Sequence, residues 1–220
     1  MPRPATDIDA LRTNLLEHAR AVIARDGLER LTMRALAAEA GSAVGLSYKA
    51  FSSRDELVWE LTLASMVELT QQLDDWVTRP GGALADRLME FSDLHFASLA
   101  PVLVDHITRG PRREELFRTA ADAGLTRSWA ALMTEFLKTR QRAGDVRGDV
   151  DVEAFAFIIT AAMHHVLVTE KPFTTPDRPT LARHIAGVAA QITVGQARRV
   201  LDDSGRSLAL GGVEVGQDRA

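Results

Sequence analysis

Signals that start and stop helices are crowded into residues 27–57. Gly27 is expected to end a first helix in the αL conformation. Thr32 is the expected N-cap of a short second helix over residues 33–40, and Gly41 ends it. A third short helix is expected over residues 43–50. Two helices of about eight residues, joined by a glycine turn and braced by a first helix, are typical of a helix-turn-helix.

Hydrophobic spacing supports these helices. The first helix has one apolar face at a spacing of about 3.6 residues, made by Leu11, Leu15, Ala19, Val22 and Ile23. Leu31 and Leu36 occupy the two positions of a hydrophobic staple around Thr32. Ser53 and Glu56 form an S-x-x-E capping box, which predicts the start of a long helix that continues through Val77.

The remainder of the chain also has helical patterns, and no stretch alternates as a strand would. Five further helices are predicted, over residues 83–98, 101–109, 112–143, 151–169 and 178–201. The predicted fold is therefore all-α, with about nine helices. We expect a flexible arm (1–8), a helix-turn-helix DNA-binding domain (9–54), a ligand-binding and dimerisation domain (55–202) and a mobile tail (203–220).

Composition excludes several classes of protein. The apolar fraction of 46% can support a core, and the absence of cysteine excludes disulfides and cysteine-ligated metals. No stretch reaches the ~18 apolar residues of a membrane span, so a cytoplasmic protein is expected. The net charge is −4, but residues 1–54 carry two more basic than acidic side chains. A basic end on an acidic chain suits a protein that contacts phosphate at one end only.

The segment LTMRALAAEAGSAVGLSYKAFSSRDEL, residues 31–57, resembles the TetR family of bacterial repressors. The positions in register with the family pattern are Thr32, Ala37, Ala40, Gly41, Gly45, Tyr48, Phe51, Ser53, Arg54 and Leu57. The resemblance continues more faintly through RAGDVRGDVDV, residues 142–152. It implies an all-α homodimer with a DNA-reading head and a body that senses a small molecule.

The third helix is expected to enter the major groove, which is about as wide as a helix. From their spacing, Val44, Tyr48 and Phe51 are expected to anchor it, while Leu46, Lys49 and Ala50 face outward. Helix N-termini and basic side chains contact phosphate without reading sequence. The predicted DNA-binding residues are Thr32, Arg34, Ala43, Val44, Gly45, Leu46, Tyr48, Lys49 and Arg54.

This chain departs from the family pattern in the third helix. Ser47 replaces a buried leucine or isoleucine, and its hydroxyl is expected to bond to the Ala43 carbonyl. Ala50 replaces a histidine or tyrosine. Because Val44 and Leu46 are apolar, we expect few hydrogen bonds to bases, with thymine methyl contacts and DNA shape sharing the discrimination.

The resemblance implies a mostly apolar ligand pocket with a few polar anchors. The candidate lining residues are Trp76, Phe91, His95, Phe96, His106, Phe117, Trp129, Met133, Phe136 and His164. The aromatic side chains are equally compatible with a packed core, because their spacing is helical. The histidines are candidate ligand anchors, metal ligands or core residues. His164 and the adjacent His165 point to different helix faces and cannot chelate one ion together, and we expect no metal and no cofactor.

The last two predicted helices are the expected homodimer surface, because they carry more apolar side chains than one subunit can cover. The predicted interface residues are Phe155, Ile158, Ile159, Ala162, Val166, Leu181, Ile185, Val188, Ala189 and Ile192. A dimer would place two recognition helices about 34–36 Å apart, as a palindrome requires.

The sequence therefore predicts a transcriptional repressor that an unknown small effector releases from double-stranded operator DNA, without contact to a membrane. An enzyme is the rival class, but no phosphate loop, nucleophile elbow or H-E-x-x-H motif is present. The alternative within the same fold is a ligand-binding dimer that has lost operator binding. Exchanging Lys49 and Arg54 together for alanine would distinguish these two by the salt dependence of DNA binding.

Overall fold

The computed structural model describes residues 7–169, 173–194, 200–201 and 207–208. Within these ranges the chain is helical, apart from one isolated bridge and two paired strands, β1 (Val200–Leu201) and β2 (Ser207–Leu208). The all-α prediction is confirmed. Most of the predicted arm, with Arg3, and most of the predicted tail lie outside the described residues.

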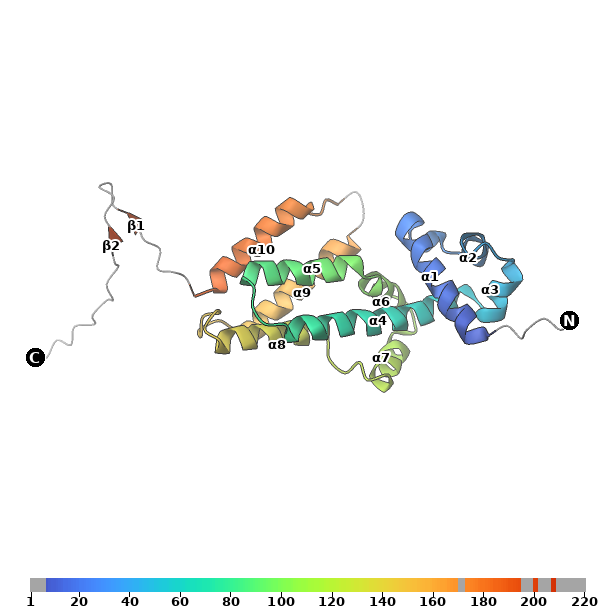
Figure 1. The fold of residues 1–220 in the computed structure, drawn as a ribbon, viewed down its shortest axis with the longest axis horizontal. Coiled ribbons are helices and arrows are strands. Elements are labelled where there is room, and N and C mark those ends of the chain that lie inside the picture. The colour runs from blue at the N-terminus through green and yellow to red at the C-terminus, as the bar shows by residue number, and fades with distance from the viewer. Residues whose placement is uncertain (1–6, 170–172, 195–199, 202–206, 209–220) are drawn as a thin grey trace, which may run out of the picture.

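The N-terminal part, which we call the head, is a compact group of short helices at one end of the molecule (Figure 1). Its elements are α1 (Ile8–Asp26), the 3-10 helix η1 (Leu28–Arg30), α2 (Met33–Glu39) and α3 (Val44–Ala50). Leu31 and Leu36 are both fully buried, so the predicted staple is formed. Gly27 ends α1 with φ 86° and ψ 161°, which is not the predicted αL conformation but a region that is essentially restricted to glycine.

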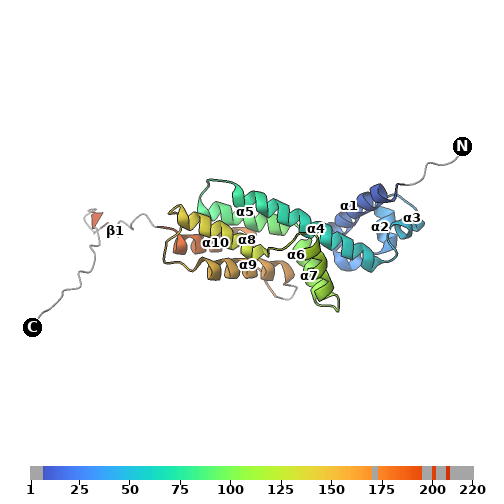
Figure 2. The same cartoon turned by 90° about the horizontal axis from the view of Figure 1, so that it is seen from below.

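The long helix α4 (Arg54–Thr78) leaves the head and runs through the rest of the molecule, as two perpendicular views show (Figures 1 and 2). It begins as predicted, with the Ser53 hydroxyl accepting a hydrogen bond from the Glu56 amide at 3.1 Å. The capping box is altered, because the Glu56 carboxylate accepts from the Ser52 amide at 2.7 Å instead of from Ser53.

The remaining helices surround the distal part of α4, and we call them the body. They are α5 (Leu84–Ala97), α6 (Ala100–Thr108), α7 (Arg113–Asp122), α8 (Trp129–Arg142), α9 (Val152–Val168) and α10 (Arg178–Ile192). The single helix predicted over residues 112–143 is wrong: it is divided into α7 and α8. Gly124, with φ 85°, turns the chain after α7, and the Ser128 hydroxyl caps α8 by accepting from the Ala131 amide at 3.1 Å.

The last helix is also shorter than the 178–201 predicted. It ends at Ile192, where the chain becomes extended and Thr193 forms a bridge with Val146. The Arg147 amide donates to the Ile192 carbonyl at 2.9 Å, and the Val194 amide donates to the Asp145 carbonyl at 3.0 Å. The loop between α8 and α9 thus holds the end of α10 in place.

Two hydrophobic cores share α4. Leu57 and Leu61 belong to the head core, whereas Leu69 and Leu73 belong to the body core. Between these pairs, α4 buries Ser65, whose hydroxyl has no hydrogen-bond partner among the described residues. Leu103 of α6 is part of the head core, while α6 also contacts α9 in the body. A displacement of α6 would therefore change packing in both the head and the body.

Candidate functional site

The exposed side of α3 is the candidate nucleic-acid surface. Residues 43, 44, 45, 48 and 49 are exposed, and the Tyr48 side chain is 55% accessible. The helix packs on the head through Ser47, Ala50 and Phe51, which are at most 2% accessible. The predicted anchoring by Val44 and Tyr48 and the outward direction of Ala50 are therefore wrong. Lys49 faces outward as predicted, and Leu46 is half-buried.

Ser47 lies on the side of α3 that packs on the head, and its burial lowers the stability of the fold. Its side chain is fully buried, and its hydroxyl has no hydrogen-bond partner among the described residues. The predicted bond to the Ala43 carbonyl is not formed. A buried hydroxyl without a partner destabilises a protein by about 1–3 kcal/mol.

Gly45 lies at the start of α3 on this exposed side. A Cβ built there would meet nothing within 4 Å, and the backbone has no positive φ. The fold of this subunit therefore does not require glycine, which is one of the least favourable residues within a helix. A residue without a side chain at this place leaves room for a partner to approach the backbone closely.

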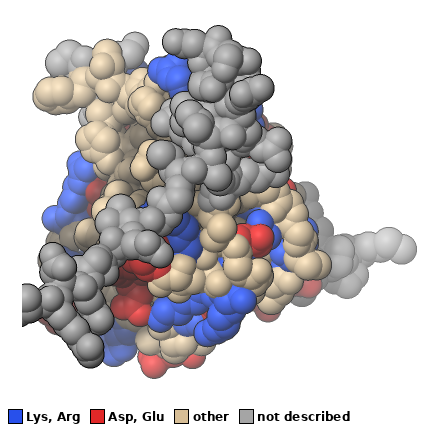
Figure 3. All heavy atoms as spheres, turned by 90° about the vertical axis from the view of Figure 1, so that its left-hand side faces the viewer, with Lys and Arg blue, Asp and Glu red and all other residues tan. Residues whose placement is uncertain are grey.

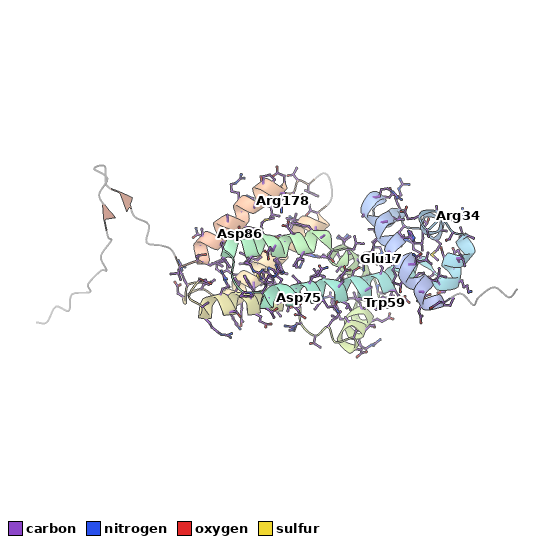
Figure 4. The ribbon with its side chains drawn as sticks, in the orientation of Figure 1. Glu17, Arg34, Trp59, Asp75, Asp86 and Arg178 are labelled. Carbon is purple, nitrogen blue, oxygen red and sulfur yellow. The ribbon has the colours of Figure 1, made fainter. Side chains whose placement is uncertain are left out.

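The surface that flanks α3 supplies polar and basic groups. The Thr32 hydroxyl accepts a hydrogen bond from the Ala35 amide at 3.0 Å and keeps its own proton free to donate. Arg34 is exposed on α2, on the outer side of the head (Figure 4). Neither Arg34 nor Lys49 forms an ion pair with any residue in the part of the chain that the structure describes.

Arg54 is placed differently from the sequence expectation. Its guanidinium donates to the backbone carbonyls of Leu31 at 2.6 Å and Leu28 at 2.9 Å, and the side chain is half-buried. It thus binds the start of α4 to the chain segment before α2. In this structure Arg54 positions the helix-turn-helix, so its removal would change folding as well as any phosphate contact.

Arg12 was missed by the sequence analysis. Its guanidinium lies 4.6 Å from the centre of the Phe51 ring and donates to the Ala50 carbonyl. It also pairs with Glu56 at 2.9 Å and with Glu60. Hydrogen bonds from Ser52 and Arg12 lower the pKa of Glu56 to about 2. Arg12 thus joins α1 to the end of α3 and the start of α4, and no local motif in the sequence marks such a long-range contact.

A cavity of about 570 Å³ opens in the body between α4, α6, α7 and the segment that leads to α8. Of the predicted pocket residues, Phe117 and Trp129 line it. The other lining residues are Met66, Thr70, Val104, Ala120, Ala121, Leu125, Thr126, Arg127 and Ser128. Its volume is in the range of cavities that bind small organic molecules.

Four predicted pocket residues are in the body core instead: Trp76, Phe91, Met133 and Phe136. The Trp76 ring centre lies 4.2 Å from that of Phe136 and 5.2 Å from that of Phe91, and its indole N–H donates to the Arg87 carbonyl at 3.0 Å. These four side chains therefore belong to the packed core, which was the alternative to a pocket lining. Phe96 is half-buried at the edge of the same core.

The three predicted pocket histidines have different surroundings. His106 is exposed and lines a separate, smaller pocket beside Pro111. His164 is half-buried, and its Nε2 lies 3.8 Å from an Asp105 carboxylate oxygen. His95 is 2% accessible, and burial lowers its pKa to about 4. In the residues the structure describes, no three His, Asp or Glu side chains gather as they would around a metal ion.

The predicted interface residues are divided between the core and the surface of the subunit. Five of the predicted interface residues are buried in the core of their own subunit: Ile159, Leu181, Ile185, Ala189 and Ile192. Three of them, Ile159, Leu181 and Ile185, also line the groove between α9 and α10. Ile158 and Ala162 are exposed, and Phe155, Val166 and Val188 are half-buried. Phe157, which was not predicted, is 68% accessible. An apolar groove of about 270 Å³ lies between α9 and α10.

The end of the body farthest from the head has mixed charge. Where described residues are visible there, basic and acidic side chains lie next to one another (Figure 3). Ion pairs at this end join Arg140 to Asp145 at 3.1 Å and Lys138 to Glu153 at 2.6 Å. This end therefore lacks the uniformly positive electrostatic potential that would attract phosphate groups. No helix among the described residues is both long and apolar enough to span a membrane.

Comparison with protein families identifies the head. Residues 15–61 match the model of the bacterial regulatory proteins of the tetR family. The matched range contains α2, α3 and the start of α4, and therefore the whole exposed surface described above. No curated protein matches the chain.

Solved structures match nearly the whole chain. The ketosteroid transcriptional regulator KstR2 of Mycobacterium tuberculosis is 23% identical, with 88% of this chain and 100% of that chain covered and a TM-score of 0.55. A TetR-family transcriptional regulator from Cytophaga hutchinsonii is 16% identical, with the same coverage and a TM-score of 0.63. A tetR-family regulatory protein from Rhodococcus RHA1 is 22% identical, covers 83% of this chain and 96% of that chain, and has a TM-score of 0.55.

Proposed function

We propose that the chain is a TetR-family transcriptional regulator that binds operator DNA as a homodimer and represses transcription in the bacterial cytoplasm. The match of residues 15–61 to the tetR-family model and the likeness of the fold to a TetR-family regulator support this proposal. A small, mostly apolar effector releases it from a palindromic site. The observation that carries the DNA-binding proposal is the exposed side of α3. There Lys49 and Tyr48 lie near Gly45, a glycine that the fold of the subunit does not require.

The contacts divide into two groups. Val44 and Gly45 present their exposed side to base edges in the major groove, and Lys49 reaches the phosphates beside it. Thr32, Arg34 and Tyr48 lie where phosphates would pass and supply hydroxyl and guanidinium donors. Arg54 acts indirectly, through its hydrogen bonds to the Leu28 and Leu31 carbonyls.

Release by the effector uses α6. This helix borders the cavity through Val104 and enters the head core through Leu103. A ligand that fills the cavity better when α6 and α7 are displaced would shift the head and change the spacing of the two recognition helices. The free-energy coupling required between the two sites is about 1–3 kcal/mol.

DNA binding to the intergenic fragment beside the protein's own gene tests the proposal. Affinity is measured at several salt concentrations, with random DNA as competitor. We expect tight, salt-sensitive binding, and Lys49→Ala should lower the salt slope by about one unit per subunit that binds DNA. Gly45→Ala should also weaken binding, because the added methyl group stands between α3 and the groove, although it stabilises the free protein by up to about 1 kcal/mol.

Lys138→Ala is the matched control, because Lys138 is on α8 and pairs with Glu153 in the body. It should leave both affinity and salt slope unchanged. If the wild type binds this fragment no better than random DNA and Lys49→Ala changes nothing, the chain is instead a ligand-binding dimer that has lost operator binding. Arg54→Ala is left out of this test because it would disturb the fold.

A further inference from the structure

The lining of the body cavity selects against charged ligands. Its only charged side chain is Arg127, and this guanidinium is already paired with Glu135 at 2.9 Å and with Asp74. The other polar groups are the hydroxyls of Thr70, Thr126 and Ser128, and the remainder of the lining is apolar. A neutral and largely apolar molecule therefore fits the cavity best.

His95 lies next to this cavity with one unused nitrogen. Its Nδ1 is 3.0 Å from the Phe91 carbonyl oxygen, and a carbonyl can only accept, so Nδ1 carries the proton. Nε2 is then a lone-pair acceptor. It is buried and has no hydrogen-bond partner among the described residues. Because burial lowers the pKa of His95 to about 4, the ring stays neutral at pH 7.

Trp129 contacts both the cavity and His95. Trp129 lines the cavity and meets the His95 ring edge to face, with ring centres 5.5 Å apart and planes at 89°. Trp129 is the first residue of α8 and is only half-buried. A residue at this position has no preceding helical turn, so the side-chain rotamers that are blocked inside a helix are open to it.

We propose that the effector is a neutral, largely apolar molecule with a hydroxyl or amide N–H donor, and that this donor binds Nε2 of His95 after the Trp129 indole rotates aside. The apolar part of the molecule occupies the cavity beside α7. The inference rests on the proposed function, since it names the chemical class of its effector. It excludes molecules that offer only acceptors, because an ether or carbonyl oxygen would face a lone pair.

Ligand binding to the full chain without DNA tests this. The probes are octan-1-ol and its isomer 1-methoxyheptane, an ether that lacks the hydrogen-bond donor, and affinity is followed by tryptophan fluorescence and by the ¹⁵N signal of the His95 ring. We expect the alcohol to bind about tenfold more tightly than the ether, which corresponds to one neutral hydrogen bond. The alcohol alone should shift the Nε2 signal.

His95→Phe should remove the preference while it keeps a flat aromatic ring, and His106→Phe, on the exposed histidine, should leave the preference unchanged. Circular dichroism verifies that both variants are folded. If His95→Phe is unfolded, the Nε2 signal of the wild type tests the proposal instead. The proposal is overturned if the alcohol does not bind, binds no better than the ether, or leaves the Nε2 signal in place. Such a failure leaves DNA binding intact, so it is distinct from a failure of the proposed function.

Discussion

Ser47 and Ser53 lie six residues apart and use their hydroxyls in opposite ways. The Ser47 hydroxyl is fully buried without a partner among the described residues, whereas the Ser53 hydroxyl accepts the Glu56 amide at 3.1 Å. Ser47→Ala removes a polar group that loses its hydration on folding and forms no hydrogen bond in return. We expect this variant to be more stable by about 1 kcal/mol, measured as a higher urea midpoint.

Ser53→Ala is the matched control for this prediction. It is the same chemical change in the same domain, but it removes the N-cap of α4 and should destabilise the protein by about 1 kcal/mol. If both variants lose stability to the same extent, the Ser47 hydroxyl has a bonding partner, and our account of its packing is wrong.

At the scale of single residues, the sequence predicted helix caps correctly but not which side of α3 is buried. Thr32, Ser53 and the staple of Leu31 with Leu36 are local patterns, and they are formed. The orientation of α3 was wrong because a seven-residue helix has apolar residues on both sides. The side that is buried depends on packing with distant parts of the chain, as in the contact between Phe51 and Arg12.

At the scale of elements, the join between α1, α3 and α4 depends on the charge of Glu56. Hydrogen bonds from Ser52 and Arg12 lower its pKa from 4.5 to about 2. A carboxyl whose pKa is lower in the folded state stabilises above pH 4.5 and loses this contribution as the pH falls from 4.5 to 2. We expect Glu56→Gln to be less stable than the wild type at pH 7 and equally stable near pH 2, as chemical denaturation would show.

Glu29→Gln is the comparison for this pH dependence. Glu29 is an exposed carboxylate in the same domain and makes no hydrogen bond with the described residues. Its replacement should shift stability by the same small amount at both pH values. A stability difference for Glu56→Gln that persists unchanged to pH 2 would mean that its cause is lost packing, not lost charge.

Element boundaries were predicted where strong signals stand at both ends, as in α4, and failed where the signals are weaker. Gly124 and Ser128 divide α7 from α8, but each alone is tolerated inside a helix. The length of α10 depends on backbone hydrogen bonds between Val194 and the loop at Asp145, which no local pattern encodes. The candidate cavity lies at the break between α7 and α8 that the sequence did not predict, and of the predicted pocket residues only Phe117 and Trp129 line it.

At the scale of the whole molecule, the apolar surface of α9 is larger than a lone subunit should expose. Phe157 and Ile158 are 68% and 57% accessible, and Ile158 lines the groove between α9 and α10. The inward residues Ile159, Leu181 and Ile185 support this face from the subunit's own core. An exposed apolar face on a rigid pair of helices is typical of a protein–protein interface. Two copies related by a twofold axis would cover it.

Phe157→Glu should therefore abolish the proposed dimer, because it places a charge at the centre of that apolar face. We expect the variant to sediment as a folded monomer in analytical ultracentrifugation and to lose high-affinity operator binding, since a monomer contacts only one half-site. Phe117→Glu, on an exposed phenylalanine of α7, serves as control and should remain dimeric. If Phe157→Glu stays dimeric, the partner surface lies elsewhere, and the exposed apolar face of α9 is not the dimer interface.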